Sequence, residues 1–286
     1  MSTTATTIAG PLRQPHNTAR DAGSGSIHDD ATASRLGFKG GTVAGSIHMD
    51  QFAPLLISLF GEEEFFAHGN LSLFFLQPTV DLEPVRALAA REPDARQAHV
   101  SMENEQGDQI ATGTASCGEP DTDTEVRDRL AKLRRGGDLR ILAGRAEGDE
   151  VTLSDYRIAS ARERLEVITE PLPAYHGEGP WDGEVAPMSH VVHGLLGVQR
   201  ELTERRISAT GLYGALEIQF LDGPLLTDRD YTAVGRIVAL TESPKTENMW
   251  WTCTFSDPQT GSDVVSVLQY MRFMKGSSPL WAEDSA

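Results

Sequence analysis

Apolar residues recur at steps of three and four in two segments of this chain, which is the spacing of one buried helix face. The first segment, near 48–60, carries Phe52, Leu55, Leu56, Leu59 and Phe60. The second, near 187–205, carries Val191, Val192, Leu195, Leu196 and Leu202. Pro54 is tolerable only if the first helix begins close before it, with Ser46 or Asp50 as the cap. The pattern therefore predicts two amphipathic helices.

Strand-like stretches follow each of these helices. After the first they fall near 70–80, 85–92, 97–104 and 109–117, and after the second near 211–221, 229–242, 247–256 and 263–274. One more strand is predicted near 150–160 and a short helix near 124–135. The first ten and last six residues are small and polar, so we expect them to fray. Each half is predicted to be one long helix wrapped by an antiparallel sheet, an α+β fold class.

An internal repeat supports a division into two halves. Residues 41–48 read Gly-Thr-Val-Ala-Gly-Ser-Ile-His and residues 183–190 read Gly-Glu-Val-Ala-Pro-Met-Ser-His, at an offset of 142 residues. Residues 71–78 and 216–224 repeat a strand that ends in proline. Two similar halves are the signature of a duplicated domain. The predicted parts are an N-terminal repeat at 1–120, a linker at 121–148 and a C-terminal repeat at 149–286.

Composition and charge exclude several functions. The formal net charge of −17 argues against nucleic-acid binding, because phosphates need clustered Lys and Arg. Cys117 and Cys253 are too few for a disulfide framework or a metal cage, which fits a reducing cytoplasm. The N-terminus lacks the charged start and apolar core of a signal peptide, and no apolar run approaches the ~20 residues of a membrane span. We therefore expect a cytoplasmic protein with no nucleic-acid or membrane partner.

Residues 28–45 carry a motif. They read His-Asp-Asp-Ala-Thr-Ala-Ser-Arg-Leu-Gly-Phe-Lys-Gly-Gly-Thr-Val-Ala-Gly. This run resembles the active-site segment of the MaoC-like (R)-specific enoyl-CoA hydratases, whose pattern is Asp-x-Asn-Pro-Ile/Leu-His, an Asp, a small residue, Gly/Ala-Phe and Val/Ile-His-Gly. The residues that fall on it are Ile27, His28, Asp30, Ala33, Gly37, Phe38, Val43 and Gly45, with one residue fewer between His28 and Phe38. Together with the internal repeat, the resemblance implies a double hot-dog fold.

Part of the family's chemical machinery is absent from the motif. Gly23 stands at the Asp position, Gly25 at the Asn position, and Ala44 replaces the second His. In the family, the carboxylate and the imidazole together hold a water and share its proton transfers. The resemblance implies that His28 is the base and that the Gly45 N–H, at a helix start, polarises a thioester carbonyl. A place to bind an acyl thioester is therefore better preserved than the hydration machinery.

Several residues are candidates for the missing acid, namely Asp21, Asp30, Asp50 or a residue of the second half. His48 and Asp50 lie near the first turn of the first helix, where both could reach a substrate beside Gly45. Hot-dog thioesterases commonly place an acidic residue in this region to activate water or attack the thioester, so Asp50 opens a second function. The alternative is a helix cap for Asp50 and a surface position for His48.

The second half offers its own polar residues, and Tyr175, His176, Asp182 and His190 could line a pocket there. His190 and His193 share one helix face and could in principle bind a metal with the residues nearby. The ligand spacing does not support a metal, so neither a metal nor another cofactor is predicted. The catalytic candidates are His28, His48 and Asp50, and the substrate-binding candidates are Gly45, Asp30, Phe38, Tyr175, His176, Asp182 and His190.

Basic residues crowd into the linker between 127 and 145. They are Arg127, Arg129, Lys132, Arg134, Arg135, Arg140 and Arg145. We interpret this span as a solvated helix and connector, and the alternative is a landing site for a CoA phosphate or an acidic carrier protein.

The functional prediction is a lyase of the MaoC-like type. It would hydrate or dehydrate an acyl thioester, or perform a related elimination or cyclisation on a compound derived from one, in a biosynthetic pathway. The predicted substrate is a small molecule linked to CoA or to a carrier protein, and a homodimer is a possible assembly. The alternatives are an acyl-thioester hydrolase and a non-catalytic acyl-binding module, which the missing Asp and His suggest.

Overall fold

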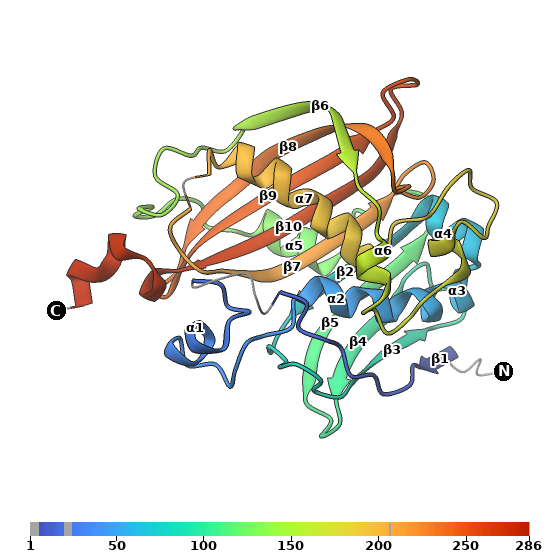
Figure 1. Cartoon of the computed structure of the whole chain (residues 1–286), viewed down its shortest axis with the longest axis horizontal. Helices are drawn as coiled ribbons and strands as arrows, with labels where there is room; N and C mark the ends of the chain where they lie inside the picture. The colour runs from blue at the N-terminus through green and yellow to red at the C-terminus, as the bar shows by residue number, and fades with distance from the viewer. Residues whose placement is uncertain (1–5, 20–24, 206, 286) are drawn as a thin grey trace.

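The computed structural model describes residues 6–19, 25–205 and 207–285. Within them, the strands form one antiparallel sheet in the order β1-β3-β4-β5-β2-β7-β10-β9-β8-β6 (Figure 1). The first-half strands are β1 (Thr6–Ala9), β2 (Gly69–Phe75), β3 (Val85–Arg91), β4 (Ala98–Asn104) and β5 (Gln109–Cys117). The second-half strands are β6 (Glu150–Ile158), β7 (Gly211–Phe220), β8 (Arg229–Glu242), β9 (Thr246–Ser256) and β10 (Asp263–Met274). Each half is a contiguous block of strands, and the two blocks meet edge to edge at β2 and β7.

The first-half helix is divided, where a single helix near 48–60 was predicted. It consists of α2 (Gly45–Met49), a 3₁₀ turn η1 (Asp50–Phe52), α3 (Ala53–Phe60) and α4 (Glu62–His68). Pro54 accounts for the tight turn, because its ring would collide with the Asp50 carbonyl of a regular helix. The Asp50 carbonyl accepts a hydrogen bond from the Ala53 N–H instead. Gly61, at φ 89°, separates α3 from α4.

The second-half helix, α7 (Met188–Leu202), is continuous and follows Pro187. It lies with α2 and α3 on the inner face of the sheet, where the main hydrophobic core forms (Figure 1). The helix α5 (Glu125–Ala131) packs on the outer face through Val126 against Phe74, Ala215 and Trp250. None of the helices in the described ranges is long and apolar enough to cross a lipid bilayer.

Some elements were not predicted. The described part of the first ten residues does not fray, because β1 pairs with β3 from Thr6 opposite Arg91 to Ala9 opposite Leu88. The chain end likewise forms a 3₁₀ helix, η4 (Pro279–Ser285), after η3 (Lys275–Ser277). The remaining short helices are α1 (Asp30–Arg35), α6 (Arg162–Leu165) and η2 (Pro173–His176).

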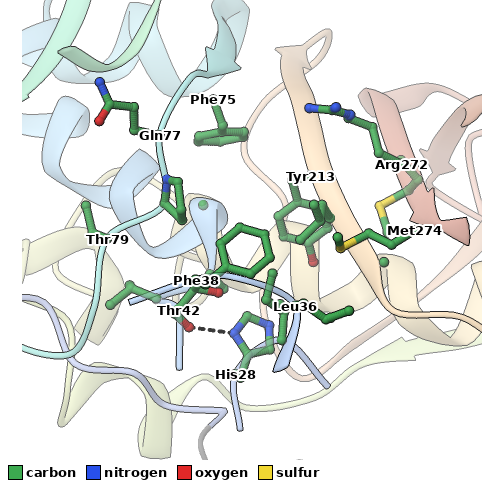
Figure 2. Close-up of a pocket in the computed structure, with 18 of the residues that line it drawn as sticks. His28, Leu36, Phe38, Thr42, Phe75, Gln77, Thr79, Tyr213, Arg272 and Met274 are labelled. Carbon is green, nitrogen blue, oxygen red and sulfur yellow. Dashed lines mark hydrogen bonds between the residues drawn. The ribbon is translucent and has the colours of Figure 1, made fainter. Parts of the chain in front are cut away.

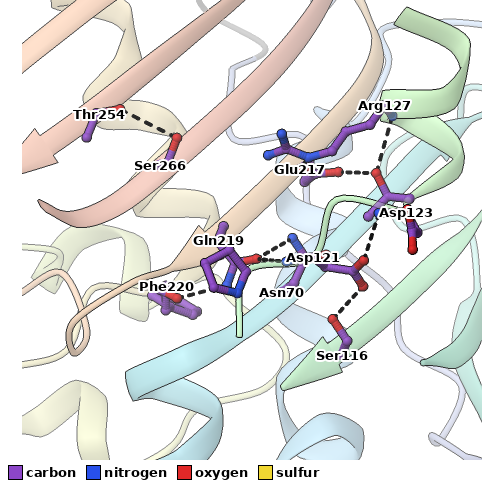
Figure 3. A network of polar contacts seen from close by, with 12 residues as sticks. Asn70, Ser116, Asp121, Asp123, Arg127, Glu217, Gln219, Phe220, Thr254 and Ser266 are labelled. Atoms are coloured by element: carbon purple, nitrogen blue, oxygen red, sulfur yellow. Dashed lines mark hydrogen bonds and ion pairs between the residues drawn. The ribbon is translucent and has the colours of Figure 1, made fainter. Parts of the chain in front are cut away.

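The seam between the two halves is the pairing of β2 with β7, from Asn70 opposite Gln219 to Phe74 opposite Ala215. Its buried polar side chains are linked to the chain that follows β5 (Figure 3). The Gln219 Oε1 atom accepts hydrogen bonds from Asn70 Nδ2 and from the Asp121 N–H, both at 3.1 Å. The Ser116 hydroxyl donates to Asp121 at 2.6 Å. The chain leaving the first half is thus fastened to the seam.

Many basic side chains of the span 127–145 have carboxylate partners. Arg127 Nε lies 2.6 Å from the buried Glu217, whose other oxygen accepts from the Thr124 hydroxyl (Figure 3). Arg145 pairs with Glu204 at 2.9 Å. Lys132, Arg135 and Arg140 also form ion pairs. These contacts agree with the interpretation of the span as a helix and connector.

Candidate active site

A cavity of about 440 Å³ opens at the seam, beyond the point where β2 and β7 stop pairing. Its first wall is formed by residues between 27 and 48, and its second by 75–79, which is the last residue of β2 and the loop after it. The third wall comes from the second half, at 211–213, 245–246, 271–272 and 274. Both halves therefore contribute to one site.

His28 is oriented in this cavity by the backbone (Figure 2). Its Nδ1 atom lies 2.7 Å from the Thr42 carbonyl oxygen, which can only accept, so Nδ1 carries the proton of the neutral ring. Its Nε2 atom has no hydrogen-bond partner among the described residues. Burial lowers the pKa of His28, and the hydrogen bond to Thr42 partly opposes that shift. The ring is thus a neutral base with its lone pair open to the cavity.

Hydrogen bonds join the segment around His28 to Asn17 and to residues 41–42. The Thr42 N–H donates to the Ile27 carbonyl at 3.1 Å, and Asn17 Nδ2 donates to the His28 carbonyl at 2.8 Å. The Gly41 N–H donates to Asp30 at 2.7 Å, and a Cβ at Gly41 would collide with the His28 carbonyl oxygen. Asp30 therefore fastens the loop and does not line the cavity.

Gly45, the first residue of α2, lines the same cavity. Its N–H has no partner among the described residues, since the first N–H groups of a helix have no carbonyl before them. A Cβ at this position would lie 2.8 Å from the Phe75 ring. Phe38 lines the cavity as well. The absence of a side chain at Gly45 therefore lets the Phe75 ring lie close to this backbone.

His48 lines the cavity and is only 2% exposed, so the surface position considered from the sequence is wrong. Its Nε2 atom lies 2.8 Å from the Thr79 hydroxyl, and Nδ1 has no partner within the described ranges. Burial lowers the pKa of His48 to about 4. His48 is therefore neutral near pH 7, and it joins α2 to the loop after β2.

Asp50 lies outside the cavity lining, 1% exposed, between the two halves. It accepts a hydrogen bond from the Ser189 N–H at 2.8 Å, in the first turn of α7. Asp50 is thus a helix cap, but for the helix of the opposite half. Burial raises its pKa to about 6, against the opposing hydrogen bonds from Ser189 and the charge of Arg164.

The second-half candidates do not come together in the cavity. Tyr175 is buried, with its ring centroid 6.3 Å from that of Phe66. His176 is exposed, Asp182 pairs with Arg229 at 3.1 Å, and His190 Nε2 lies 2.9 Å from the Ala159 carbonyl oxygen. Among the described residues, no group of three or more His, Cys, Asp or Glu side chains could hold a metal ion. The candidate acid Asp21 and the motif position Gly23 lie outside the described residues.

The repeat-equivalent place in the second half lacks the same groups. The offset of 142 puts Glu170 at the position of His28 and Pro187, which has no N–H, at that of Gly45. Glu170 forms an ion pair with Arg13 at 2.5 Å. Aromatic rings pack in this region, among them Phe65, Phe66, Trp181 and Phe220. The duplicated fold therefore retains the histidine and the free N–H together in one repeat alone.

Three cavity residues had no signal in the motif, because they lie in the second half, in β7, in β10 and in the turn between β8 and β9. They are Tyr213, Lys245 and Arg272. Burial raises the pKa of Tyr213, and the charge of Arg164 opposes that shift. The Arg272 Nε atom is buried without a partner among the described residues. The sequence predicted these strands correctly but could not show that their ends, and the turn between β8 and β9, reach the first half.

Solved structures with the same fold are known. No protein-family model and no curated protein matches this chain by sequence. A MaoC-like dehydratase superposes with a TM-score of 0.55 at 12% identity, over 95% of this chain and 98% of its own. A putative MaoC domain protein dehydratase from Chloroflexus aurantiacus gives 0.58 at 11% identity, over 95% of both chains. A conserved hypothetical protein from Mycobacterium tuberculosis with a double hotdog fold gives 0.59 at 9% identity, over 94% of this chain and 96% of its own. These likenesses confirm the predicted double hot-dog fold.

Proposed function

We propose that the cavity is the active site of a hydro-lyase that adds water to, or removes it from, an acyl thioester. One observation carries the proposal: His28 and Gly45 line one cavity, and neither His28 Nε2 nor the Gly45 N–H has a hydrogen-bond partner among the described residues. If the thioester carbonyl oxygen accepts a hydrogen bond from the Gly45 N–H, the hydrogen on the α-carbon becomes more acidic. His28 is then the base that takes the α-proton.

Two cations support a substrate linked to CoA or to a phosphopantetheine carrier. Lys245 and Arg272 line the cavity from the second half and form no ion pair within the described ranges. Unpaired cations at a cavity are notable in a chain with a formal net charge of −17. Phosphate groups are the partners that such side chains bind, Arg through paired hydrogen bonds and Lys as a point charge.

The placement of Asp50 favours the lyase over the thioesterase. A thioesterase of the kind considered needs a carboxylate that reaches the thioester or its attacking water. None of the described residues that line the cavity is acidic. The Asp50 carboxylate caps α7 instead.

The test uses short- and medium-chain trans-2-enoyl-CoA thioesters and a thiol reagent. We expect the enoyl absorbance to fall while no free CoA appears, and the His28→Gln variant to lose this activity. Release of free thiol would support the thioesterase instead. Tight binding of the thioester with no turnover would support the non-catalytic acyl-binding module. The homodimer, the biosynthetic role and the cytoplasmic location stay predictions.

A further inference from the structure

In the proposed lyase the leaving hydroxyl must take up a proton to depart as water, and a second proton-transfer group besides the base can supply it. The family position for this group is Gly23 in this chain. Of the candidate replacements, Asp30 is bonded to the Gly41 N–H and Asp50 to the Ser189 N–H. The described lining of the cavity has no carboxylate to do this work.

We propose that the Tyr213 hydroxyl is the general acid that protonates the leaving hydroxyl group, opposite His28. This inference rests on the proposed lyase function and assigns one of its two proton-transfer groups to the second half. A phenol donates one proton and accepts it back, so it can serve both directions of the reaction.

A β-bulge turns Tyr213 toward the cavity. In the pairing of β10 with β7, Tyr270 lies opposite Ala215, but the next residue, Met271, lies opposite Tyr213, so that Gly214 is the extra residue. Ala215 belongs to the outer-face core, and strict alternation would put Tyr213 on that face too. The bulge instead packs Tyr213 with the inner-face core. Bulges re-aim side chains in this way beside active sites.

Gly214 permits this bulge. A Cβ at Gly214 would collide with the Tyr270 ring on the outer face. The sequence Tyr213-Gly214 therefore combines the functional side chain with the small residue that its orientation requires.

The Tyr213 hydroxyl is free to act. It has no hydrogen-bond partner among the described residues, and its side chain lines the cavity. In Figure 2 the hydroxyl end of the ring is directed toward the part of the cavity that His28 and Leu36 line. Because burial raises the pKa of Tyr213, the phenol keeps its proton near pH 7 until a stronger base forms beside it.

The step balances as follows. His28 Nε2 takes the proton of the α-carbon, and the electron pair of that C–H bond becomes the new carbon–carbon double bond. The bond between the β-carbon and oxygen breaks with its electron pair on the oxygen, which takes the Tyr213 proton and leaves as water. The proton on His28 then returns to the Tyr213 phenolate. Hydration is the same sequence in reverse.

The test compares Tyr213→Phe with Tyr270→Phe on trans-2-enoyl-CoA hydration. The Tyr270 ring stacks on Trp250 on the outer face, so this variant is the matched control for loss of a tyrosine hydroxyl outside the cavity. We expect Tyr213→Phe to lower kcat by roughly two to four orders of magnitude with little change in KM, and the control to keep wild-type kcat. Wild-type activity should fall at high pH, where the phenol of Tyr213 ionises. The residual activity of Tyr213→Phe should not show this fall.

Thermal unfolding verifies that both variants fold. Unchanged kcat in Tyr213→Phe overturns the assignment, as does an equal loss in Tyr270→Phe. Loss of activity in Asp21→Asn together with full activity in Tyr213→Phe would give the acid role to Asp21. A wild-type protein that hydrates no enoyl thioester would instead remove the proposed function, and this assignment with it.

Discussion

The Nδ1 atom of His28 lies 2.7 Å from the carbonyl oxygen of Thr42, and this contact fixes which ring nitrogen can act as a base. Thr42 is in turn held by its N–H, which donates to the Ile27 carbonyl beside His28. The ring is therefore oriented by backbone within one loop and needs no carboxylate partner.

Replacing His28 should remove the chemistry and leave the fold. We expect His28→Gln or His28→Ala to lower turnover of an enoyl thioester by roughly two to four orders of magnitude, the usual contribution of a general base. His176→Gln is the matched control, because His176 is exposed and outside the cavity. Steady-state kinetics measures the turnover, and circular dichroism verifies that the variants keep the fold. Equal turnover in His28→Gln and wild type would contradict the placement of the site.

The pH dependence of kcat/KM should report the environment of His28. Only the neutral ring accepts a proton, so activity falls as the pH drops through its pKa in the free enzyme. Burial places that pKa below the ordinary value of 6.5. We therefore expect the acid limb of the profile to have its midpoint below pH 6.5. A midpoint at or above 6.5 would contradict a buried, neutral His28 as the base.

The strands were predictable from the sequence because their burial follows a simple rule. In β8, predicted at 229–242 and observed at those residues, buried and exposed positions largely alternate. The divided first-half helix was less predictable, since its apolar spacing continues across the 3₁₀ turn that Pro54 imposes. β1 escaped prediction because its short, polar sequence is stabilised by pairing with β3, a contact distant in the chain.

The candidate site could be predicted only in part. The motif marked His28 and Gly45, and these line one cavity with His48. Asp50 is two residues after His48, which on a helix is a rotation of roughly 200°, so its side chain leaves the cavity side. Tyr213 could not be found from the sequence, because the bulge at Gly214 reverses the face that strand alternation assigns to it.

Asp50 should matter for stability and not for chemistry. Asp50→Asn keeps an oxygen that can accept from the Ser189 N–H, whereas Asp50→Ala leaves that buried N–H unpaired. We expect the Asn variant to exceed the Ala variant in free energy of unfolding by about 1–3 kcal/mol, measured by urea denaturation. Both should keep wild-type turnover when folded. Loss of turnover in the folded Asn variant would favour the thioesterase.

The last prediction concerns the pH dependence of stability, which His48 and Asp50 influence in opposite directions. The pKa of His48 falls from 6.5 to about 4 on folding, so its contribution is present above pH 6.5 and is lost as the pH falls through about 4. The pKa of Asp50 rises from 3.8 to about 6, so its contribution is present below pH 3.8 and is lost as the pH rises through about 6. Each effect is on the order of 3 kcal/mol, at about 1.4 kcal/mol per pKa unit. The two therefore nearly cancel between pH 4 and 6 in the wild type.

Single variants should separate the two contributions to the pH dependence of the free energy of unfolding. In Asp50→Asn only the His48 effect remains, so the free energy of unfolding should rise from pH 4 to 6.5 more steeply than in the wild type. In His48→Gln only the Asp50 effect remains, and the free energy of unfolding should fall relative to wild type as the pH rises from 4 to 6. Urea denaturation at several pH values measures the slopes, and comparison with the wild type removes the background from other titrating groups. Two variants whose stability runs parallel to that of the wild type would contradict both pKa shifts.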